Sequence, residues 1–166
     1  GLIEDMQILS GDLVSNGDFS QEGSELITNG DFATDTAWTK GSGWTISGGK
    51  ANASATTGQL YQGTTTTINT QYKIKYTISN YVSGSYNFLL RGTSTATFSG
   101  NGTFTVYITS GSNGNSNFII DGVSSFTGSI DNVSVKEVGQ DWSLGGEVTI
   151  GDNLAHFESN TNTYSY

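Results

Sequence analysis

Strict alternation of apolar and polar side chains is the feature of this 166-residue sequence that most limits its fold. In residues 72–79 (YKIKYTIS) every second residue is Tyr or Ile, and Lys, Thr or Ser stands between them. Shorter alternating runs occupy residues 86–91, 103–108 and 133–136. Because successive side chains of a β-strand point to opposite faces, a period of two predicts strands with one buried and one solvated face. Clusters of Gly, Asn and Ser between the runs predict tight turns, and therefore an all-β antiparallel sandwich.

The composition excludes several kinds of structure and partner. Helix-forming Lys, Glu and Ala are scarce, so long helices are not expected, and the lack of cysteine excludes disulfides. No run approaches the roughly 18 apolar residues that a membrane span needs. The net charge of −9 disfavours nucleic acids and anionic membranes, which bind proteins through Lys and Arg. An acidic surface suits neutral glycans or divalent cations, although solubility alone explains it equally well.

Two internal repeats organise the chain. Residues 13–19 (LVSNGDF) recur 13 residues later as residues 26–32 (LITNGDF), a spacing too short for a domain. Residues 38–51 match residues 142–155, a shift of 104 residues, which is the size of one β-sandwich. The repeats therefore predict three parts.

The predicted parts are an N-terminal leader or remnant of a preceding module (residues 1–23), one complete sandwich module (residues 24–138) and an incomplete second repeat (residues 139–166). The incomplete repeat is too short to bury a core. We expect it to pack on the module, to pair with another chain or neighbouring repeat, or to remain loose. Since the chain begins with Gly1, we expect it to be a piece of a longer repetitive protein.

Several motifs, in order and spacing, resemble carbohydrate-binding modules of the family 4 and 9 type: residues 29–32 (NGDF), Trp38, residues 43–51 (GWTISGGKA), residues 72–74 (YKI) and residues 130–135 (IDNVSV). The resemblance implies a galactose-binding-like jelly roll over residues 24–138. Tandem copies of such units look like those in bacteriophage tail fibres and secreted bacterial surface proteins.

The resemblance therefore implies a non-catalytic glycan-binding adhesion module, exposed outside a cell or on a virion. The alternative is a self-assembling structural fibre or spacer module with no ligand, because a fold does not dictate a function.

The resemblance also implies a structural calcium ion. Its matching acid is Asp131, with Asp31 and the backbone at Lys50 as companions. Calcium needs six to eight oxygen ligands, and Ala33 stands where many relatives have a Glu. The alternative is that Asp31 and Asp131 are turn and strand-end residues that accept hydrogen bonds from backbone amides.

A sugar site needs aromatic faces and planar polar groups on the solvent side of a sheet. The alternation places four such side chains outward, and we predict that they bind the ligand: Tyr61, Asn87, Arg91 and Tyr107. The alternative is that they form ordinary cross-strand pairs on a wetted sheet.

The tryptophans are expected to pack in the interior. Trp38 recurs as Trp142 in the second copy, whereas Trp44 is replaced there by Val148, which is typical of a packing position. Catalysis is not expected either. His156 is the only histidine and lies in the incomplete repeat, and no two acids fall on strands as glycoside hydrolysis requires.

Overall fold

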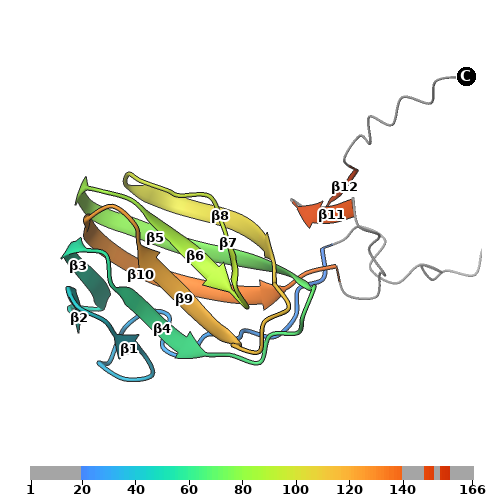
Figure 1. The fold of residues 1–166 in the computed structure, drawn as a ribbon, viewed down its shortest axis with the longest axis horizontal. Coiled ribbons are helices and arrows are strands. Elements are labelled where there is room, and N and C mark those ends of the chain that lie inside the picture. Colours follow the sequence, from blue (N-terminus) through green and yellow to red (C-terminus); the bar gives the residue numbers. More distant parts are fainter. Residues whose placement is uncertain (1–19, 140–147, 152–153, 158–166) are drawn as a thin grey trace, which may run out of the picture.

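The chain folds into two antiparallel β-sheets that pack face to face (Figure 1). The structure is a computed structural model that describes residues 20–139, 148–151 and 154–157. Its strands are β1 (Thr39–Lys40), β2 (Trp44–Ser47), β3 (Lys50–Thr56), β4 (Gln59–Gly63), β5 (Gln71–Ser83), β6 (Tyr86–Leu90), β7 (Thr93–Ser94), β8 (Gly102–Thr109), β9 (Asn117–Gly122), β10 (Phe126–Glu137), β11 (Val148–Gly151) and β12 (Leu154–Phe157). The described residues contain no helix that could cross a membrane. The predicted all-β sandwich is confirmed.

Each sheet has five strands, and we name the sheets by their central strands. The β9 sheet has the order β1-β4-β9-β6-β7, and the β10 sheet has the order β2-β3-β10-β5-β8. From β3 onward the chain crosses repeatedly between the sheets, so that β4, β6 and β9 lie opposite β5, β8 and β10. This crossing is typical of a jelly roll, in which most sheet neighbours are distant in sequence.

The inward side chains of the two sheets form a core rich in aromatic rings. On β5 the alternation is as predicted, and Tyr72, Ile74, Tyr76 and Ile78 are all buried. The ring of Tyr76 lies 4.6 Å from that of Phe88 on the opposite sheet. Such edge-to-face contacts add to the hydrophobic burial that joins the two sheets.

Trp38 and Trp44 belong to this core, as predicted, since only 7% and 4% of their surfaces are exposed. Each indole nitrogen donates a hydrogen bond to a backbone carbonyl, Trp38 to Asn29 at 3.0 Å and Trp44 to Gly58 at 2.8 Å. Both rings therefore pack and anchor loops, and neither is presented to solvent.

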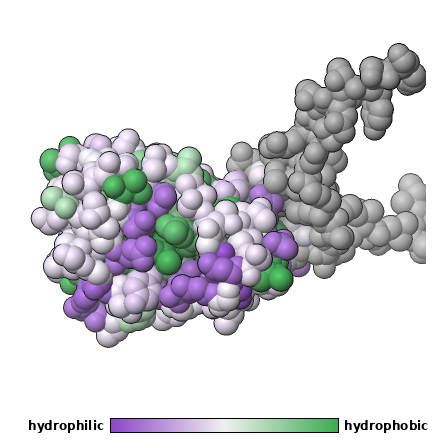
Figure 2. Space-filling view, viewed as in Figure 1, coloured by the Kyte–Doolittle hydropathy of each residue, from purple (hydrophilic) through white to green (hydrophobic). Residues whose placement is uncertain are grey.

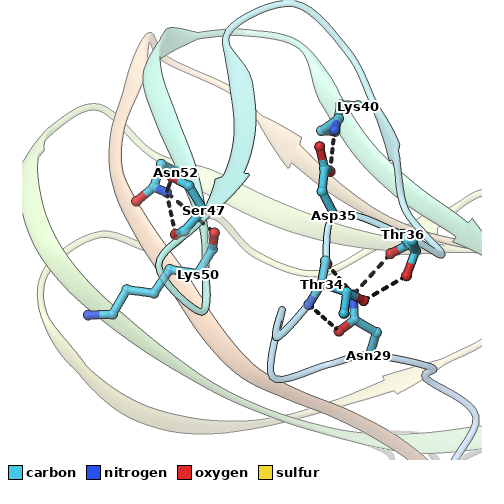
Figure 3. Close-up of polar contacts among 8 residues, drawn as sticks. All are labelled: Asn29, Thr34, Asp35, Thr36, Lys40, Ser47, Lys50 and Asn52. Carbon is cyan, nitrogen blue, oxygen red and sulfur yellow. Dashed lines mark hydrogen bonds and ion pairs between the residues drawn. The ribbon is translucent and has the colours of Figure 1, made fainter.

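The Asn-Gly-Asp-Phe motif closes the loop before β1. The side-chain amide of Asn29 donates to the carbonyls of Thr34 and Thr36 and accepts from the backbone N–H of Thr34 (Figure 3). A Cβ at Gly30 would lie 2.0 Å from the carbonyl oxygen of Val133, so only glycine fits there. Phe32 is 1% exposed. Three of the four motif residues thus have structural roles.

The segment before this loop runs along β10. Glu22 forms an isolated bridge with Val138, and the backbone N–H of Leu26 donates to Val135 at 3.0 Å. Glu22 precedes the boundary predicted at residue 24 but still contacts the module. The domain boundaries remain predictions.

The hairpin of β11 and β12 repeats the register of β2 and β3. Trp44 pairs with Ala53 in the first hairpin, and Val148 pairs with Phe157 in the second, both shifted by 104 residues. The other three pairs are shifted by the same amount. The second hairpin lies apart from the two sheets (Figure 1). The match in sequence thus extends to strand pairing.

Candidate ligand-binding face

The outer, solvent-facing side of the β9 sheet, here called the β9 face, carries side chains in rows that cross the strands. One row consists of Thr39, Tyr61, Ile119, Leu89 and Ser94, each paired with the next across neighbouring strands. The adjacent row consists of Gln59, Asp121 and Asn87, from β4, β9 and β6. Directly opposed residues in antiparallel strands have Cβ atoms roughly 5 Å apart. The two rows therefore form a continuous surface.

The middle of the first row is apolar. Tyr61, Ile119 and Leu89 are half-buried, because their inward neighbours fill the core and these three side chains cover the outside of the sheet. Figure 2 shows a hydrophobic patch near the centre of this side of the molecule, with hydrophilic residues on its flanks. Such a patch suits the C–H surface of a sugar ring, which stacks on aromatic and aliphatic side chains.

The second row is polar and only partly solvated. Burial raises the pKa of Asp121, and a side-chain hydrogen bond with Gln59 opposes that shift. The Oδ1 atom of Asn87 is buried and has no hydrogen-bond partner among the described residues. A buried acceptor without a donor is unfavourable by about 1–3 kcal/mol. A ligand hydroxyl would satisfy it once a turn of the Asn87 side chain exposes the atom.

The structure brings together only two of the four predicted ligand residues. Tyr61 and Asn87 lie in adjacent rows of the β9 face. Tyr107 lies on the opposite sheet, where it pairs with Lys73. Arg91 does not continue the alternation, because β6 ends at Leu90 and Arg91 has a positive φ of 49°. The expectation that alternation carries Arg91 onto the same strand face is therefore wrong. Ligand binding by Tyr61, Asn87 and Arg91 remains a prediction, whereas Tyr107, on the other sheet, is not part of a site on the β9 face.

Sequence reasoning missed Gln59, Ile119 and Asp121. Residues 117–122 (NFIIDG) contain a continuous Phe-Ile-Ile run, in which Ile119 faces outward between two inward residues. A short apolar run does not show which residues face the core. The isolated Asp121 after that run was the available signal, but only strand pairing places it beside Asn87.

The outer side of the β10 sheet, here called the β10 face, is basic. It carries Lys73 and Lys75 on β5 and Lys136 on β10, and Lys50 at the start of β3 reaches across β10 to donate to Ser79 on β5 at 2.9 Å. Glu22 forms ion pairs with Lys73 at 2.8 Å and Lys136 at 3.1 Å.

These ion pairs affect both titrations. The hydrogen bond from Lys73 lowers the pKa of Glu22, and the same bond raises the pKa of Lys73. The N-terminal segment thus satisfies charges on the β10 face.

The predicted calcium position gathers three segments of chain. The backbone N–H of Val133 donates to Gly30 at 2.9 Å, and a Cβ at Gly49 would lie 3.9 Å from the carbonyl oxygen of Asp31. Asp31 accepts from the N–H of Ala33 at 3.3 Å, and Asp131 accepts from the N–H of Asn132 at 2.7 Å.

Both acids thus make the backbone contacts expected of turn and strand-end residues. Among the described residues, no three His, Cys, Asp or Glu side chains gather to hold a metal. A calcium ion here would depend mainly on backbone carbonyls, and its binding remains a prediction.

No known family model matches the chain, and no curated protein matches it. A solved structure that resembles it is a mannan-binding module from Man5C in bound conformation. The TM-score is 0.47 and the identity is 17%, over 63% of this chain and 94% of that module. A resemblance at this level assigns neither a family nor a ligand to the chain.

Proposed function

We propose that this chain is a non-catalytic glycan-binding adhesion module of a repetitive protein, exposed outside a cell or on a virus particle, as in a tail fibre. The observation that supports it most is the β9 face. There an apolar row with one aromatic ring lies beside a polar row made of two amides and a carboxylate. The polar row is Gln59, Asp121 and Asn87, and the Oδ1 atom of Asn87 accepts no hydrogen bond from the described residues.

The two rows suit the two surfaces of a sugar. Ring C–H groups stack on Tyr61, Ile119 and Leu89, and hydroxyls donate to Asp121 and to the Oδ1 atom of Asn87. Neighbouring strands lie about 4.8 Å apart, so the surface across β4, β9 and β6 offers contacts to more than one sugar unit. A single open face gives weak affinity, and repetition along the parent protein raises the total strength through avidity.

We expect binding without cleavage because of the number of carboxylates on the β9 face. Among the described residues of the β9 face, Asp121 is the only carboxylate. Glycoside hydrolysis uses a pair of carboxyl groups about 5–10 Å apart. We therefore expect the module to retain glycans intact.

A glycan array followed by calorimetry tests the proposal. The sample should be oligomeric and loaded with calcium, and the hits should be repeated with Tyr61→Ala and Asn87→Ala. We expect the wild type to bind a cell-surface polysaccharide or glycan and both variants to lose most of that affinity. Tyr107→Ala, on the opposite sheet, is the matched control. No binding by the wild type to any glycan would refute the proposal.

The second candidate is a structural fibre or spacer module that binds no ligand. It is favoured by the β11–β12 hairpin, which repeats the register of the first hairpin at a spacing of 104 residues and suggests association with neighbouring repeats. In that case Tyr61→Ala and Tyr107→Ala leave host attachment unchanged, whereas deletion of residues 141–166 disrupts assembly of the parent fibre. Sedimentation of the full and truncated chains measures the difference.

Calcium remains part of the proposal. If Asp31, Asp131 and the backbone at Lys50 hold calcium, millimolar calcium should raise the melting temperature of the wild type but not of Asp131→Asn. Asp35→Asn, an acid on an exposed loop, is the control. Equal melting temperatures of the wild type in calcium and in chelator would refute the site.

A further inference from the structure

Three loops meet at the end of the β9 face, beside the last residue of β6. They span residues 64–70, 91–92 and 110–116. The Ser110 hydroxyl donates to Thr67 at 2.5 Å and accepts from the N–H of Thr70 at 3.1 Å, and the N–H of Gly111 donates to Leu90 at 3.2 Å. These bonds hold an open depression of about 290 Å³ that is lined by Arg91, Gly92, Thr93, Gly111, Ser112 and Asn113. We call it the Arg91 pocket.

Glycines allow the loops to approach. A Cβ at Gly111 would lie 2.2 Å from the carbonyl oxygen of Arg91, and a Cβ at Gly92 would lie 2.4 Å from the side-chain nitrogen of Asn113. Gly92 also has a φ of 84°, which other residues rarely adopt. The pocket therefore depends on two positions that only glycine fills without a shift of the backbone.

Arg91 is held in place but has no counter-ion. Its Nε donates to the carbonyl of Thr66 at 2.8 Å, and its Nη1 donates to the carbonyl of Asn113 at 2.9 Å. Both acceptors are neutral, and none of the ion pairs in the described residues includes Arg91. The guanidinium is thus pre-oriented, and its remaining N–H groups, those of Nη2 among them, are available to a planar anion.

The pocket lies beside the end of the β9 sheet that β6 reaches at Leu90. Leu90 pairs with Phe118, so Arg91 follows at the level of Asn117, one row beyond Tyr61, Ile119 and Leu89. The face therefore has a carboxylate at one end and a guanidinium at the other. Asp121 and Asn117 are four residues apart on β9, which separates these ends by roughly 13 Å along the strand.

The overall acidity of the chain does not oppose an anion at this position. Residues 20–139 contain seven acids and six bases, a net charge of −1, whereas the remaining eight acids lie in residues 1–19 and 140–166. Of the bases, Lys40 is paired with Asp35, and four others gather on the β10 face. Arg91 is the only base at this end of the β9 face among the described residues.

We propose that the Arg91 pocket binds the carboxylate of an acidic sugar unit, of the uronic acid kind, in a glycan whose other units lie on the β9 face. The proposal rests on the proposed function of that face. Arginine pairs with a planar carboxylate through two parallel N–H groups. The hydroxyls of Thr93 and Ser112 lie beside it as further donors.

Polygalacturonate and the same polymer after chemical reduction of its carboxyl groups are the probes, compared by affinity electrophoresis and calorimetry. We expect the wild type to bind the acidic polymer at least tenfold more tightly than the reduced one. Arg91→Gln should remove this preference. Ser112→Asp should reduce it at least tenfold, because the new carboxylate pairs with Arg91 and competes with the ligand.

Loss of binding by Arg91→Gln could result from misfolding, and Ser112→Asp tests the pocket without that problem. Ser112 is exposed, and Arg91 keeps its contacts with Thr66 and Asn113 in this variant. Thr105→Asp adds the same charge to the β10 face and should leave binding unchanged. Equal binding of the two polymers by the wild type, or no effect of Ser112→Asp, would overturn the proposal. The proposal would also be overturned if Arg91→Gln weakened binding to dextran sulfate but did not weaken binding to polygalacturonate.

The failure of this inference is distinguishable from failure of the proposed function. If a neutral glycan binds and loses affinity in Tyr61→Ala, while Arg91→Gln and Ser112→Asp change nothing with polygalacturonate, only the carboxylate pocket is refuted. If no neutral or acidic glycan binds the wild type, both are refuted.

Discussion

The two outer faces of the sandwich differ in how completely their polar groups are satisfied. On the β10 face Glu22 pairs with Lys73 and Lys136. On the β9 face the Oδ1 atom of Asn87 is buried without a partner, and Asp121 is desolvated. Proteins retain such unfavourable groups mainly where function needs them. This difference is the reason for placing the proposed ligand site on the β9 face, whereas the β10 face is stabilised by contacts within its own chain.

The largest expected effect is the difference in glycan affinity between variants of Tyr61 on the β9 face and Tyr107 on the β10 face. Tyr61→Ala should weaken glycan binding by about tenfold to a hundredfold, because it removes the aromatic surface on which a sugar stacks. Tyr107→Ala should leave the affinity unchanged, since it lies on the β10 sheet opposite Lys73. Calorimetry of both variants with the same glycan makes the comparison. Equal losses in the two variants would contradict the assignment of the site to one face.

Asp121→Asn should lower affinity while raising stability. The substitution replaces a charge-assisted hydrogen bond to the ligand with a neutral one, and we expect a loss of about fivefold to tenfold. Because burial raises the pKa of Asp121, the folded state binds this proton more readily, and stability is lost as the pH rises through that pKa.

The variant should therefore be more stable than the wild type at neutral pH, by up to about 1 kcal/mol. Its advantage should disappear as the pH falls below the ordinary carboxyl value of 3.8. Urea unfolding at several pH values measures this effect, and Glu137→Gln, at an acid that takes part in none of the ion pairs of the described residues, is the control. A variant that is destabilised at neutral pH, with unchanged affinity, would contradict the prediction.

The smallest expected effect concerns the β10 face. Glu22→Gln should lower the free energy of unfolding by roughly 1 kcal/mol and leave glycan affinity unchanged, because it breaks two partly exposed ion pairs. The pKa of Glu22 is lowered in the fold, so its contribution is present above the ordinary value of 4.5 and is lost as the pH falls through the folded value.

The unfolding curves of the wild type and Glu22→Gln should therefore converge in acid. Glu137→Gln removes one acidic charge from β10, the strand that carries Lys136, without breaking an ion pair of the described residues, and it is the matched control. Identical curves at neutral pH would show that Glu22 does not stabilise the β10 face.

Much of the fold could be predicted from local pattern. The alternation in residues 72–79 predicted which side chains of β5 are buried, and the replacement of Trp44 by Val148 in the second copy predicted that Trp44 packs. The repeat of 104 residues predicted an incomplete second copy, and the strand pairs of β11 and β12 repeat those of β2 and β3 at the same spacing. The pattern failed at Arg91, because a left-handed residue ends β6 one position earlier than the alternation suggests.

The sequence by itself determined the alternating strands, their inward faces and the candidates Tyr61 and Asn87, because each depends on the period of two within one strand. It did not determine the inward face of β9, whose apolar run lacks that period. Only the tertiary structure decided that β9 lies between β4 and β6, which places Asp121 beside Asn87 and Gln59. It also placed Tyr107 on the other side of the sandwich and Arg91 in a loop pocket. The reason is that pairing between distant strands depends on how two sheets bury their faces against each other, which local alternation does not encode.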